Sequence, residues 1–437
     1  MISAGLHASA QNGLRRRVRP VQNENVSTPD FDVLIVGAGA AGLAAARDLE
    51  RNGRRVACLE ARERVGGRIL TVHDPLTAVP IEMGAEFIHG RSPEIFDLIH
   101  EAGLGVYELG GHAVGEDNMD RVMEDIKRLP DDAPDQTLSK FLDSRDYSEE
   151  EKHAALSFVE GFDAAHADRI GVAGLARDEQ AADRIEGHRS FRILNGYGSL
   201  LAALGTSAVR LNSIVESIAW RRGNSTVHVR SALTGRDESL RAARVLITVP
   251  LGVLQSAAIR FDPEPADTLR AARALASGDV FRVTMRFETP FWETKPDFAG
   301  AGFIFADEPL FPTWWTTNPV QTPVITGWSA GPKADPLRGQ ARQAIIKAAV
   351  ASLEHIVGLP SARLQSAWLH DWHADPFARG AYSYVPAGAL RARCRLAEPV
   401  EDTLYFAGEA TDLVGYGGTV HGAIASGRRA AAQILAA

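Results

Sequence analysis

A glycine-rich loop near the amino end of the chain limits the possible fold more than any other feature. Residues 33–36 (V-L-I-V) form a continuous apolar run, as expected of a parallel strand that is covered on both faces. The loop G-A-G-A-A-G follows at 37–42, then an alanine-rich stretch, and then a second apolar run over 55–59 that ends on Glu60. This order of strand, loop, helix, strand and acid predicts a dinucleotide-binding βαβ unit.

Each position of this unit has a chemical reason. Gly37 permits the tight turn, Gly39 lets the backbone approach a pyrophosphate, and Gly42 lets the helix pack against the strand. The first helical turn, which contains Ala41, presents free N–H groups and a partial positive charge to the phosphates. Glu60 is expected to accept hydrogen bonds from an adenosine ribose.

Composition narrows the class of protein. A chain of 437 residues suggests two or three domains. Its net charge of −8 disfavours nucleic acid or an anionic membrane as partner, and the absence of about 18 consecutive apolar residues predicts no spanning helix. Two cysteines are too few for a disulfide scaffold or a thiolate metal cluster, so no metal is expected and the predicted location is cytoplasmic. Residues 1–30 are predicted to be a disordered tail, because their basic cluster precedes polar residues instead of the apolar run of an export signal.

Residues 60–68 (E-A-R-E-R-V-G-G-R) resemble the E-A-R-x-x-x-G-G-R segment of flavin-containing amine oxidases. Further similar segments are 81–90 (I-E-M-G-A-E-F-I-H-G), 405–410 (Y-F-A-G-E-A) and 417–423 (G-G-T-V-H-G-A), which resemble polyamine oxidases and lysine-specific histone demethylases. The resemblance implies an FAD-dependent oxidoreductase that acts on amines.

The resemblance also implies a fold class and a domain plan. The fold is expected to be mixed α/β, with a discontinuous Rossmann-type FAD-binding domain and an inserted α+β substrate-binding domain. The predicted FAD-binding segments are 31–90, 195–260 and 366–437, and the substrate-binding segments are 91–194 and 261–365. The residues implied to bind FAD are Gly37, Gly39, Ala41, Gly42, Glu60, Arg62, Gly67, Arg68, Gly84, Ala85, Val215, Gly408, Glu409, Thr419 and Val420.

Four residues are implied to form the substrate site beside the flavin. Tyr382 aligns with an aromatic residue on the path of the substrate amine, where a ring face can hold an ammonium group. Thr419 stands where monoamine oxidases carry a second tyrosine, which implies a more open pocket. His89 matches a histidine that contacts substrate in polyamine oxidases, and Glu86 in the same loop is a candidate for attracting a cationic substrate. Ala381 replaces the cysteine that links to flavin in mammalian monoamine oxidases, so FAD is expected to be bound non-covalently.

Arg282 completes the implied catalytic set of Tyr382, Thr419, His89 and Arg282, and it departs from the family. The family has a lysine there, which holds a water near flavin N5 and assists the reaction with oxygen. Arginine is longer, planar and permanently charged, so slow reoxidation by oxygen is expected. Alternation along 281–287 places Arg282, Thr284 and Arg286 on one face of a strand. Arg282 then either reaches flavin N5 or turns away to pair with a carboxylate.

The leading hypothesis is oxidation of a C–N bond of a polyamine or monoamine to an imine, with O₂ reduced to H₂O₂, by a monomer or homodimer. The alternatives are an L-amino-acid oxidase, an amine dehydrogenase that reacts poorly with O₂, a histone demethylase, and a flavin-binding protein without activity. An L-amino-acid oxidase needs an arginine to bind the substrate carboxylate, and Arg282 is a candidate for that role.

Overall fold

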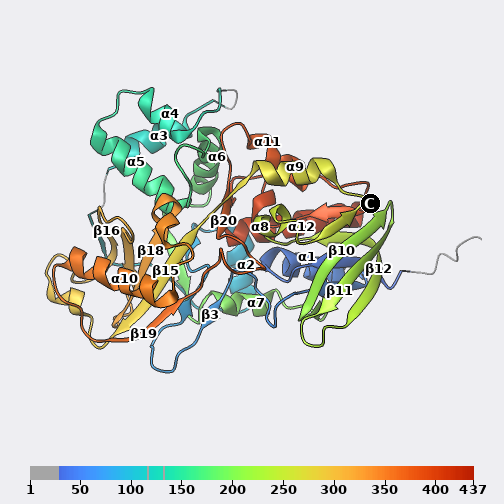
Figure 1. Cartoon of the computed structure of the whole chain (residues 1–437), viewed down its shortest axis with the longest axis horizontal. Helices are drawn as coiled ribbons and strands as arrows, with labels where there is room; N and C mark the ends of the chain where they lie inside the picture. Colours follow the sequence, from blue (N-terminus) through green and yellow to red (C-terminus); the bar gives the residue numbers. More distant parts are fainter. Residues whose placement is uncertain (1–28, 116–117, 131–132) are drawn as a thin grey trace, which may run out of the picture.

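The computed structural model describes residues 29–115, 118–130 and 133–437. Within them the chain forms two lobes, each built on its own sheet (Figure 1). The predicted disordered tail, residues 1–30, lies outside the described residues except for Pro29 and Asp30. Both lobes contain helices and strands, so the fold is mixed α/β, as expected from the sequence.

The larger sheet has eight strands in the order β13-β10-β11-β12-β1-β2-β9, with β21 paired to β12. Its strands are β1 (Phe31–Val36), β2 (Val56–Leu59), β9 (Val209–Arg210), β10 (Ser213–Arg221), β11 (Asn224–Ser231), β12 (Asp237–Ile247), β13 (Arg260–Asp262) and β21 (Leu404–Phe406). β1 runs parallel to β2 and β12, and Val36 at its end lies opposite Leu59 and Ile247. Three segments distant in sequence therefore end at the edge of the sheet where the glycine loop begins.

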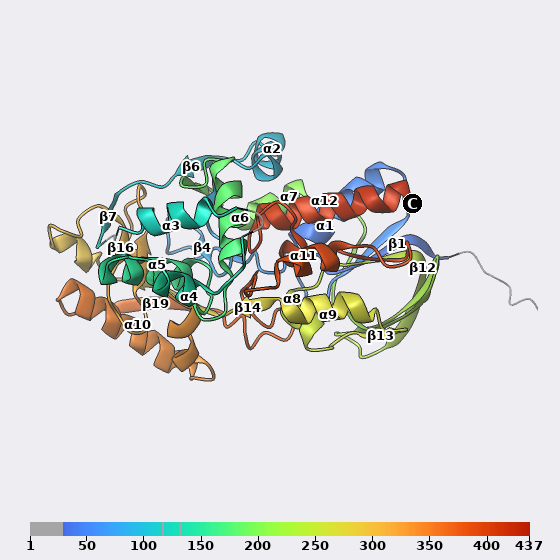
Figure 2. The ribbon, with the colours of Figure 1, turned by 90° about the horizontal axis from the view of Figure 1, so that it is seen from above.

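The period of two along β1 explains how the lobe is layered. Val33 and Ile35 pack on one face with the helices α1 (Ala40–Arg51) and α12 (Val420–Ala436), whereas the alternate residues of β1 pack on the other face. α1 and α12 lie side by side (Figure 2). A Cβ atom at Gly427 would lie 2.2 Å from the carbonyl oxygen of Ala41, so the last helix packs directly against the backbone of the first.

The second lobe is built on a six-stranded sheet of order β19-β15-β18-β17-β16-β7. Its strands are β7 (His112–Val114), β15 (Val280–Phe287), β16 (Ala301–Phe305), β17 (Thr313–Thr316), β18 (Val324–Ala330) and β19 (Leu364–Leu369). Phe281, Val283, Met285 and Phe287 pack against α10 (Arg342–Val357), as the alternation predicted. The opposite face of β15 carries polar residues but is also buried. Arg282 on this face has only 6% of its surface exposed.

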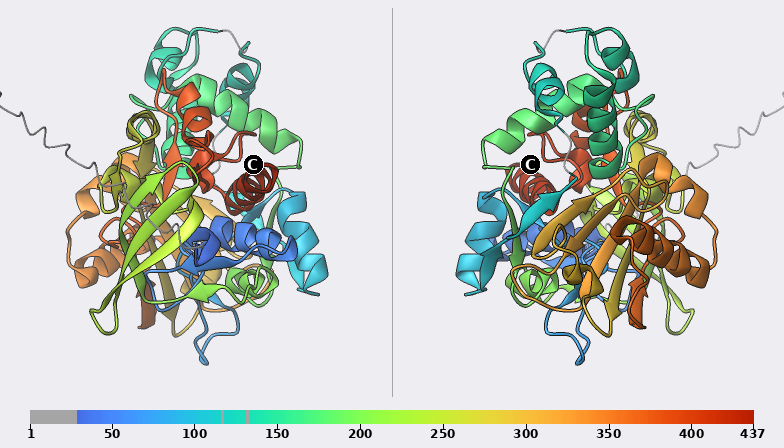
Figure 3. Two further views of the ribbon diagram at one scale, coloured as in Figure 1. Left: turned by 90° about the vertical axis from the view of Figure 1, so that its right-hand side faces the viewer. Right: turned by 90° about the vertical axis from the view of Figure 1, so that its left-hand side faces the viewer.

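A group of helices covers one side of the molecule, and both end views in Figure 3 show it at the top. The helices of this region are α3 (Asp120–Lys127), α4 (Leu138–Asp143), α5 (Glu149–Phe162) and α6 (Val172–Asp183). A capping box starts α5: the Ser148 side chain accepts a hydrogen bond from the N–H of Glu151, whose carboxylate accepts one from the N–H of Ser148. α5 then runs inward and ends at Phe162.

The remaining elements are short. The strands are β3 (Thr71–Val72), β4 (Ile81–Glu82), β5 (Ile88–His89), β6 (Val106–Glu108), β8 (Ser190–Ile193), β14 (Ala276–Gly278) and β20 (Tyr382–Tyr384). The α-helices are α2 (Pro93–Glu101), α7 (Leu200–Ala203), α8 (Leu251–Gln255), α9 (Ala266–Ala274) and α11 (Leu390–Ala397). Single 3-10 turns occur at Tyr197–Ser199, Phe291–Thr294, Gly331–Lys333, Asp335–Leu337 and Glu409–Thr411.

The chain turns sharply between β9 and β10. Asn212 adopts a positive φ of 55°, and its N–H donates to the carbonyl of Arg62 at 2.9 Å. The chain therefore turns there, so that β9 pairs with β2 while β10 pairs with β11. Two of the predicted domain boundaries, after residue 260 and after residue 365, fall inside β13 and β19. The domain plan as a whole remains a prediction.

Candidate functional site

A cavity of about 1690 Å³ lies between the two lobes. Ligand pockets in proteins usually measure about 300–1,000 Å³, so this space can hold a dinucleotide together with a second molecule. At the ends of the parallel strands, the cavity is lined by Val36, Leu59 and Thr248. On the side of the helices, it is lined by Phe158 and Leu175. The cavity thus begins at the glycine loop and extends to the helices of the second lobe.

The glycine loop has the geometry that the sequence predicted. Gly37 has a φ of +105°, and a Cβ atom at Gly42 would lie 2.0 Å from the carbonyl oxygen of Gly37, so neither position tolerates a side chain without movement. Gly39 is the N-cap of α1 and offers no side-chain cap. The N–H groups of the first turn, including that of Ala41, therefore remain available at the cavity wall.

The paired glycines at 66 and 67 lie against this loop. The N–H of Gly66 donates to the carbonyl of Ala38 at 2.8 Å, and Gly67 adopts a φ of +59°. A Cβ atom at Gly67 would lie 3.4 Å from the Cα of Gly39. The two glycine segments thus form one continuous backbone surface that lines the cavity.

Glu60 follows β2 and is buried at the predicted ribose end. Its carboxylate accepts hydrogen bonds from the N–H groups of Ala38 at 2.8 Å and Arg62 at 3.0 Å. Each carboxylate oxygen can accept more than one hydrogen bond, so Glu60 shapes the loop and keeps capacity for a ligand hydroxyl. Val215 on β10 lines the same part of the cavity, as expected.

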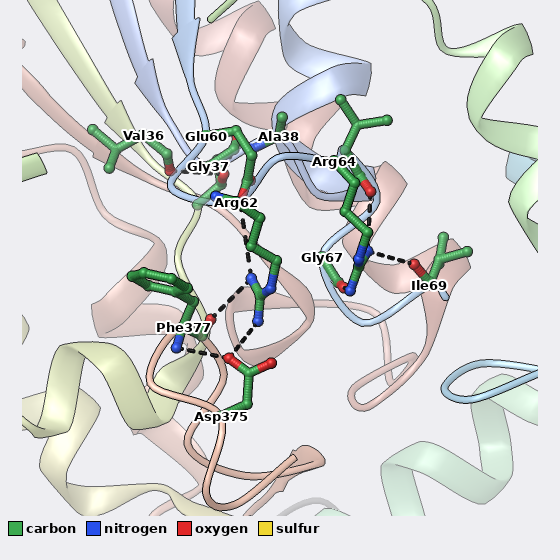
Figure 4. A network of polar contacts seen from close by, with 12 residues as sticks. Val36, Gly37, Ala38, Glu60, Arg62, Arg64, Gly67, Ile69, Asp375 and Phe377 are labelled. Carbon is green, nitrogen blue, oxygen red and sulfur yellow. Dashed lines mark hydrogen bonds and ion pairs between the residues drawn. The ribbon is translucent and has the colours of Figure 1, made fainter. Parts of the chain in front are cut away.

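Arg62 also lines the cavity, but its guanidinium is bound to protein groups (Figure 4). It donates to the carboxylate of Asp375 at 2.7 Å and lies 5.4 Å from the centre of the Phe377 ring. The sequence placed Arg62 among the direct ligands of the cofactor. In the structure its polar contacts connect the glycine-loop region to a segment more than 300 residues away.

Arg68 and Glu409 form an ion pair at the centre of the cavity wall, with Arg68 Nη1 and Glu409 Oε1 3.0 Å apart. Arg68 also donates to the carbonyl of Ala381 at 2.6 Å, and Glu409 accepts from the Ser383 hydroxyl at 2.6 Å and the Gly418 N–H at 2.9 Å. Burial would raise the pKa of Glu409, but Arg68 and these donors hold it below its usual value. A charged Glu409 therefore joins four separate segments of the predicted FAD site.

Gly84 and Ala85 pack onto the backbone of Arg68. A Cβ atom at Gly84 would lie 1.8 Å from the Arg68 carbonyl oxygen, to which the N–H of Ala85 donates at 3.2 Å. Gly408, at a φ of +125°, lines the cavity next to Glu409. These positions permit a close approach of backbone segments around one space.

The N-terminus of α12 points its first turn at the cavity, which Thr419 and Val420 line. The Thr419 hydroxyl accepts from the N–H of Gly422 at 3.0 Å and donates to the carbonyl of Tyr416 at 2.7 Å. Thr419 is therefore a helix cap, which leaves the cavity without an aromatic side chain at this position. This geometry agrees with the expected open wall.

The predicted substrate-site residues Tyr382 and His89 both line the cavity near the end of α5. The Tyr382 hydroxyl donates to the Phe162 carbonyl at 2.6 Å, and burial followed by the charge of Asp163 raises the pKa of Tyr382, so the phenol stays protonated. The His89 ring lies 5.2 Å from the Phe162 ring, with Nδ1 3.2 Å from the Ser190 hydroxyl. Burial lowers the pKa of His89 to about 4, so its imidazole is neutral near pH 7.

Arg282 forms a buried ion pair with Glu86, the second of the two orientations expected for it. It also donates to the carbonyl of Gly84 at 3.0 Å and lies 5.5 Å from the centre of the Trp315 ring. Arg192 binds the same carboxylate at 2.7 Å. Burial would raise the pKa of Glu86, but Arg282 and Arg192 hold it below its usual value. The idea that Glu86 attracts a cationic substrate is therefore wrong, because two guanidinium groups outweigh its single charge.

Two residues that sequence reasoning missed also line the cavity. Asp163 is the C-cap of α5, and its carboxylate has no hydrogen-bond or ion-pair partner among the described residues. Burial, and then the nearby charge of Asp178, raise the pKa of Asp163. His421 is 3% exposed and likewise has no hydrogen-bond partner within the described part of the chain. Burial lowers the pKa of His421 to about 3.

Comparisons with known proteins agree with this geometry. The family model of flavin containing amine oxidoreductases matches residues 40–154 and 127–435. The chain is 28% identical to polyamine oxidase 4 of Oryza sativa subsp. japonica, over 94% of this chain and 89% of that protein. It is also 28% identical to lysine-specific histone demethylase 1 homolog 3 of Arabidopsis thaliana, but there it spans only 30% of the relative.

Solved structures share the fold. A putrescine oxidase bound to putrescine superposes with a TM-score of 0.79 at 23% identity, and cyclohexylamine oxidase from Brevibacterium oxydans IH-35A with 0.77 at 22%. In both cases 93% of this chain and 99% of the other are covered. Among the described helices, none combines the length and apolar character needed to cross a membrane.

Proposed function

We propose a substrate class for this chain, which belongs to the family of flavin-containing amine oxidoreductases and is an FAD-dependent oxidoreductase acting on amines. The substrate is a diamine or polyamine, and the C–N bond at one end is oxidised to an imine. The observation that carries the proposal is the carboxylate of Asp163 in the cavity wall, which has no ion-pair partner within the described part of the chain.

The residues present fit FAD. The glycine surface at Gly37, Gly39 and Gly67 leaves room for a pyrophosphate, and the first turn of α1 offers N–H groups to it. FAD is bound non-covalently, and position 381 holds an alanine, which has no thiol to link to it. When bound, FAD accepts the hydride equivalent that leaves the carbon beside the amine nitrogen.

The protein supplies orientation and a partly apolar environment around the reacting amine. The Tyr382 ring offers a face on which an amine can rest, and its hydrogen bond to Phe162 limits its movement. His89 is neutral, so it can accept a hydrogen bond from the amine without repelling a cation. Trp328 donates from Nε1 to the carbonyl of Gly161 at 2.9 Å and so holds the same end of α5.

Asp163 follows directly after Phe162, and its carboxyl group, which a neighbouring cation favours in the ionised form, supplies the charge that a second ammonium group needs. Asp178 and Glu179 on α6 also line the cavity, and of these three acids only Asp178 has an ion-pair partner among the described residues, namely Arg393 at 3.1 Å. An ammonium group beside a carboxylate in a partly desolvated site is stabilised by several kcal/mol at an effective dielectric constant of about 20. A monoamine would leave this carboxylate without a partner.

We propose molecular oxygen as the electron acceptor, reduced to H₂O₂ in a slow step. The guanidinium of Arg282 is held in place by Glu86 and the Gly84 carbonyl, and this fixed, planar group does not reproduce the single ammonium with which the family's lysine holds a water at the flavin. The same engagement argues against an L-amino-acid oxidase, because neither Arg282 nor Arg192 is free to bind a substrate carboxylate.

Anaerobic reduction of the flavin by a panel of substrates tests the proposal. Putrescine, spermidine, n-butylamine and L-leucine are mixed with the holoenzyme under argon, and the loss of flavin absorbance is followed. Putrescine or spermidine should reduce the flavin at least tenfold faster than butylamine at equal concentration. If L-leucine is fastest by tenfold, a barrier difference of about 1.4 kcal/mol, the enzyme is an amino-acid oxidase.

A further inference from the structure

Residues 370–380, here named the cover segment, connect β19 to β20 and lie along the cofactor side of the cavity, where Trp372, Pro376 and Phe377 contribute to its lining. The segment is attached at both ends. The Trp372 Nε1 donates to the carbonyl of Met83 at 2.9 Å. Near the other end, a Cβ atom at Gly252 would lie 2.2 Å from the carbonyl oxygen of Arg379. The cover segment therefore spans from the predicted flavin side to α8.

Its central attachment is the Asp375 carboxylate, of which 9% is exposed. Asp375 accepts from Arg62 Nη2 at 2.7 Å and from the N–H of Phe377 at 2.9 Å, and it lies 2.9 Å from His370 Nε2. Burial would raise the pKa of Asp375, but the hydrogen bonds from His370 and Arg62 hold it far below its usual value. The Asp375 carboxylate is therefore ionised near pH 7.

The other partner, Arg62, stands two residues after Glu60, and its N–H donates to that carboxylate. Arg62 Nη1 lies 3.8 Å from Glu60 Oε1, so the guanidinium lies between the two acids Glu60 and Asp375. A buried carboxylate deprived of its cation is strongly destabilised. Separation of the cover segment from Arg62 is therefore unfavourable unless both groups gain water.

We propose that Asp375 is a positioning residue that, through Arg62, holds the cover segment closed over the adenosine end of FAD. Glu60 and Arg62 line the cavity there, and Pro376 and Phe377, which adjoin Arg62 through Asp375 and the Phe377 ring, line it as well. If the cover segment is already fixed before FAD binds, the protein loses less conformational entropy when FAD binds, and FAD is released more slowly. The inference rests on FAD as the cofactor and not on the proposed diamine substrate.

A direct role of Arg62, as a ligand of FAD, is the competing explanation. The two roles differ in how substitutions combine. If Arg62 acts through Asp375, removal of either partner abolishes the same interaction, and the double substitution adds little to a single one. If Arg62 binds FAD directly, Arg62→Gln weakens binding far more than Asp375→Asn does, and the effects add.

Apoprotein reconstitution measures this without any substrate. Apoproteins of wild type, Arg62→Gln, Asp375→Asn and the double variant are titrated with FAD, with flavin fluorescence giving Kd and dilution giving the release rate. Each single variant should bind FAD about tenfold more weakly, with faster release, and the double variant should match the singles. Asp402→Asn is the control, because its pair with Arg222, at 3.1 Å, lies on the surface with both side chains more than half exposed.

The inference is overturned if Asp375→Asn keeps Kd within twofold of wild type, or if the double variant loses about 100-fold. Far-UV circular dichroism of each apoprotein reports whether it is folded. Should Asp375→Asn not fold, Trp372→Phe is the second variant, because it removes the hydrogen bond to Met83 and part of the ring packing at the end of the cover segment. It should then release FAD several-fold faster, and an unchanged release rate would overturn the inference. Failure of every amine to reduce the flavin would refute the proposed function and leave these binding results intact.

Discussion

Asp163→Asn is the substitution that tests the substrate class most directly. Asparagine keeps the size of the side chain and removes its charge, so a diamine loses an ion pair while a monoamine loses nothing. A hydrogen bond to a charged group contributes about 1.5–3 kcal/mol, which corresponds to roughly 10- to 150-fold in kcat/KM. Asp178 and Glu179 remain in the same wall and retain part of the attraction. We therefore expect a loss near the lower limit, about tenfold, for putrescine.

The assay compares anaerobic flavin reduction by putrescine and by n-butylamine in stopped flow. Butylamine has the same carbon chain and lacks the second ammonium group, so its rate should change by less than twofold in Asp163→Asn. The control is Asp168→Asn, because Asp168 is exposed and lies outside the cavity lining. Equal losses for the two amines would show that Asp163 shapes the cavity and does not bind a second charge.

The pH dependence provides an independent check. Burial and the charge of Asp178 raise the pKa of Asp163, and only the ionised carboxylate attracts the second ammonium group. The apparent KM for putrescine should therefore increase as the pH falls through the pKa of Asp163. This increase should be absent in Asp163→Asn, and its persistence would assign the titration to another group.

Three further predictions follow from other parts of the structure. Arg282→Lys keeps the charge beside Glu86 and frees volume, so reoxidation of the reduced enzyme by oxygen should accelerate by ~10-fold, or about 1.4 kcal/mol; an unchanged stopped-flow rate would contradict this. Burial raises the pKa of Glu82 to about 7. The contribution of protonated Glu82 to the stability of the folded protein is therefore fully present below about pH 4.5 and is lost as the pH rises through about 7. Glu82→Gln should consequently raise the Tm at about pH 8 and flatten its pH dependence, and a lower Tm there would refute the assignment. Gly42→Ala places a Cβ atom 2.0 Å from the Gly37 carbonyl oxygen, so the purified protein should contain less than a tenth of the wild-type flavin, measured by absorbance against a Gly53→Ala control.

The local features of the site could be predicted from sequence because they depend on neighbouring residues. The turn at Gly37, the helix that begins at Ala40 and the acid at Glu60 lie within one βαβ unit of about 30 residues. The alternation along β15 likewise follows from the period of two in a strand. The resemblance to the family added the distant segments, including Arg68 and Glu409, which form an ion pair in the structure.

The remaining features depend on contacts that no local pattern encodes. The partner of Arg62 is Asp375, 313 residues later, and the partner of Arg282 is Glu86, 196 residues earlier. Asp163 gave no signal, because an acid at the end of a polar helix is usually solvated and only the tertiary structure places this one in a cavity. Prediction therefore failed at those side chains whose roles depend on which distant segment packs against them.

The packing of α12 against α1 has a consequence for the order of events during synthesis. The glycine loop leaves the ribosome more than 350 residues before Glu409, Thr419 and α12 do. Until then the surface of α1 that receives Gly427 has no partner, and the ion pair between Arg68 and Glu409 cannot form. Capture of the flavin is thus expected to be a late step, after α12 has packed against α1 and Glu409 has reached Arg68, and nascent chains that lack these residues should be colourless.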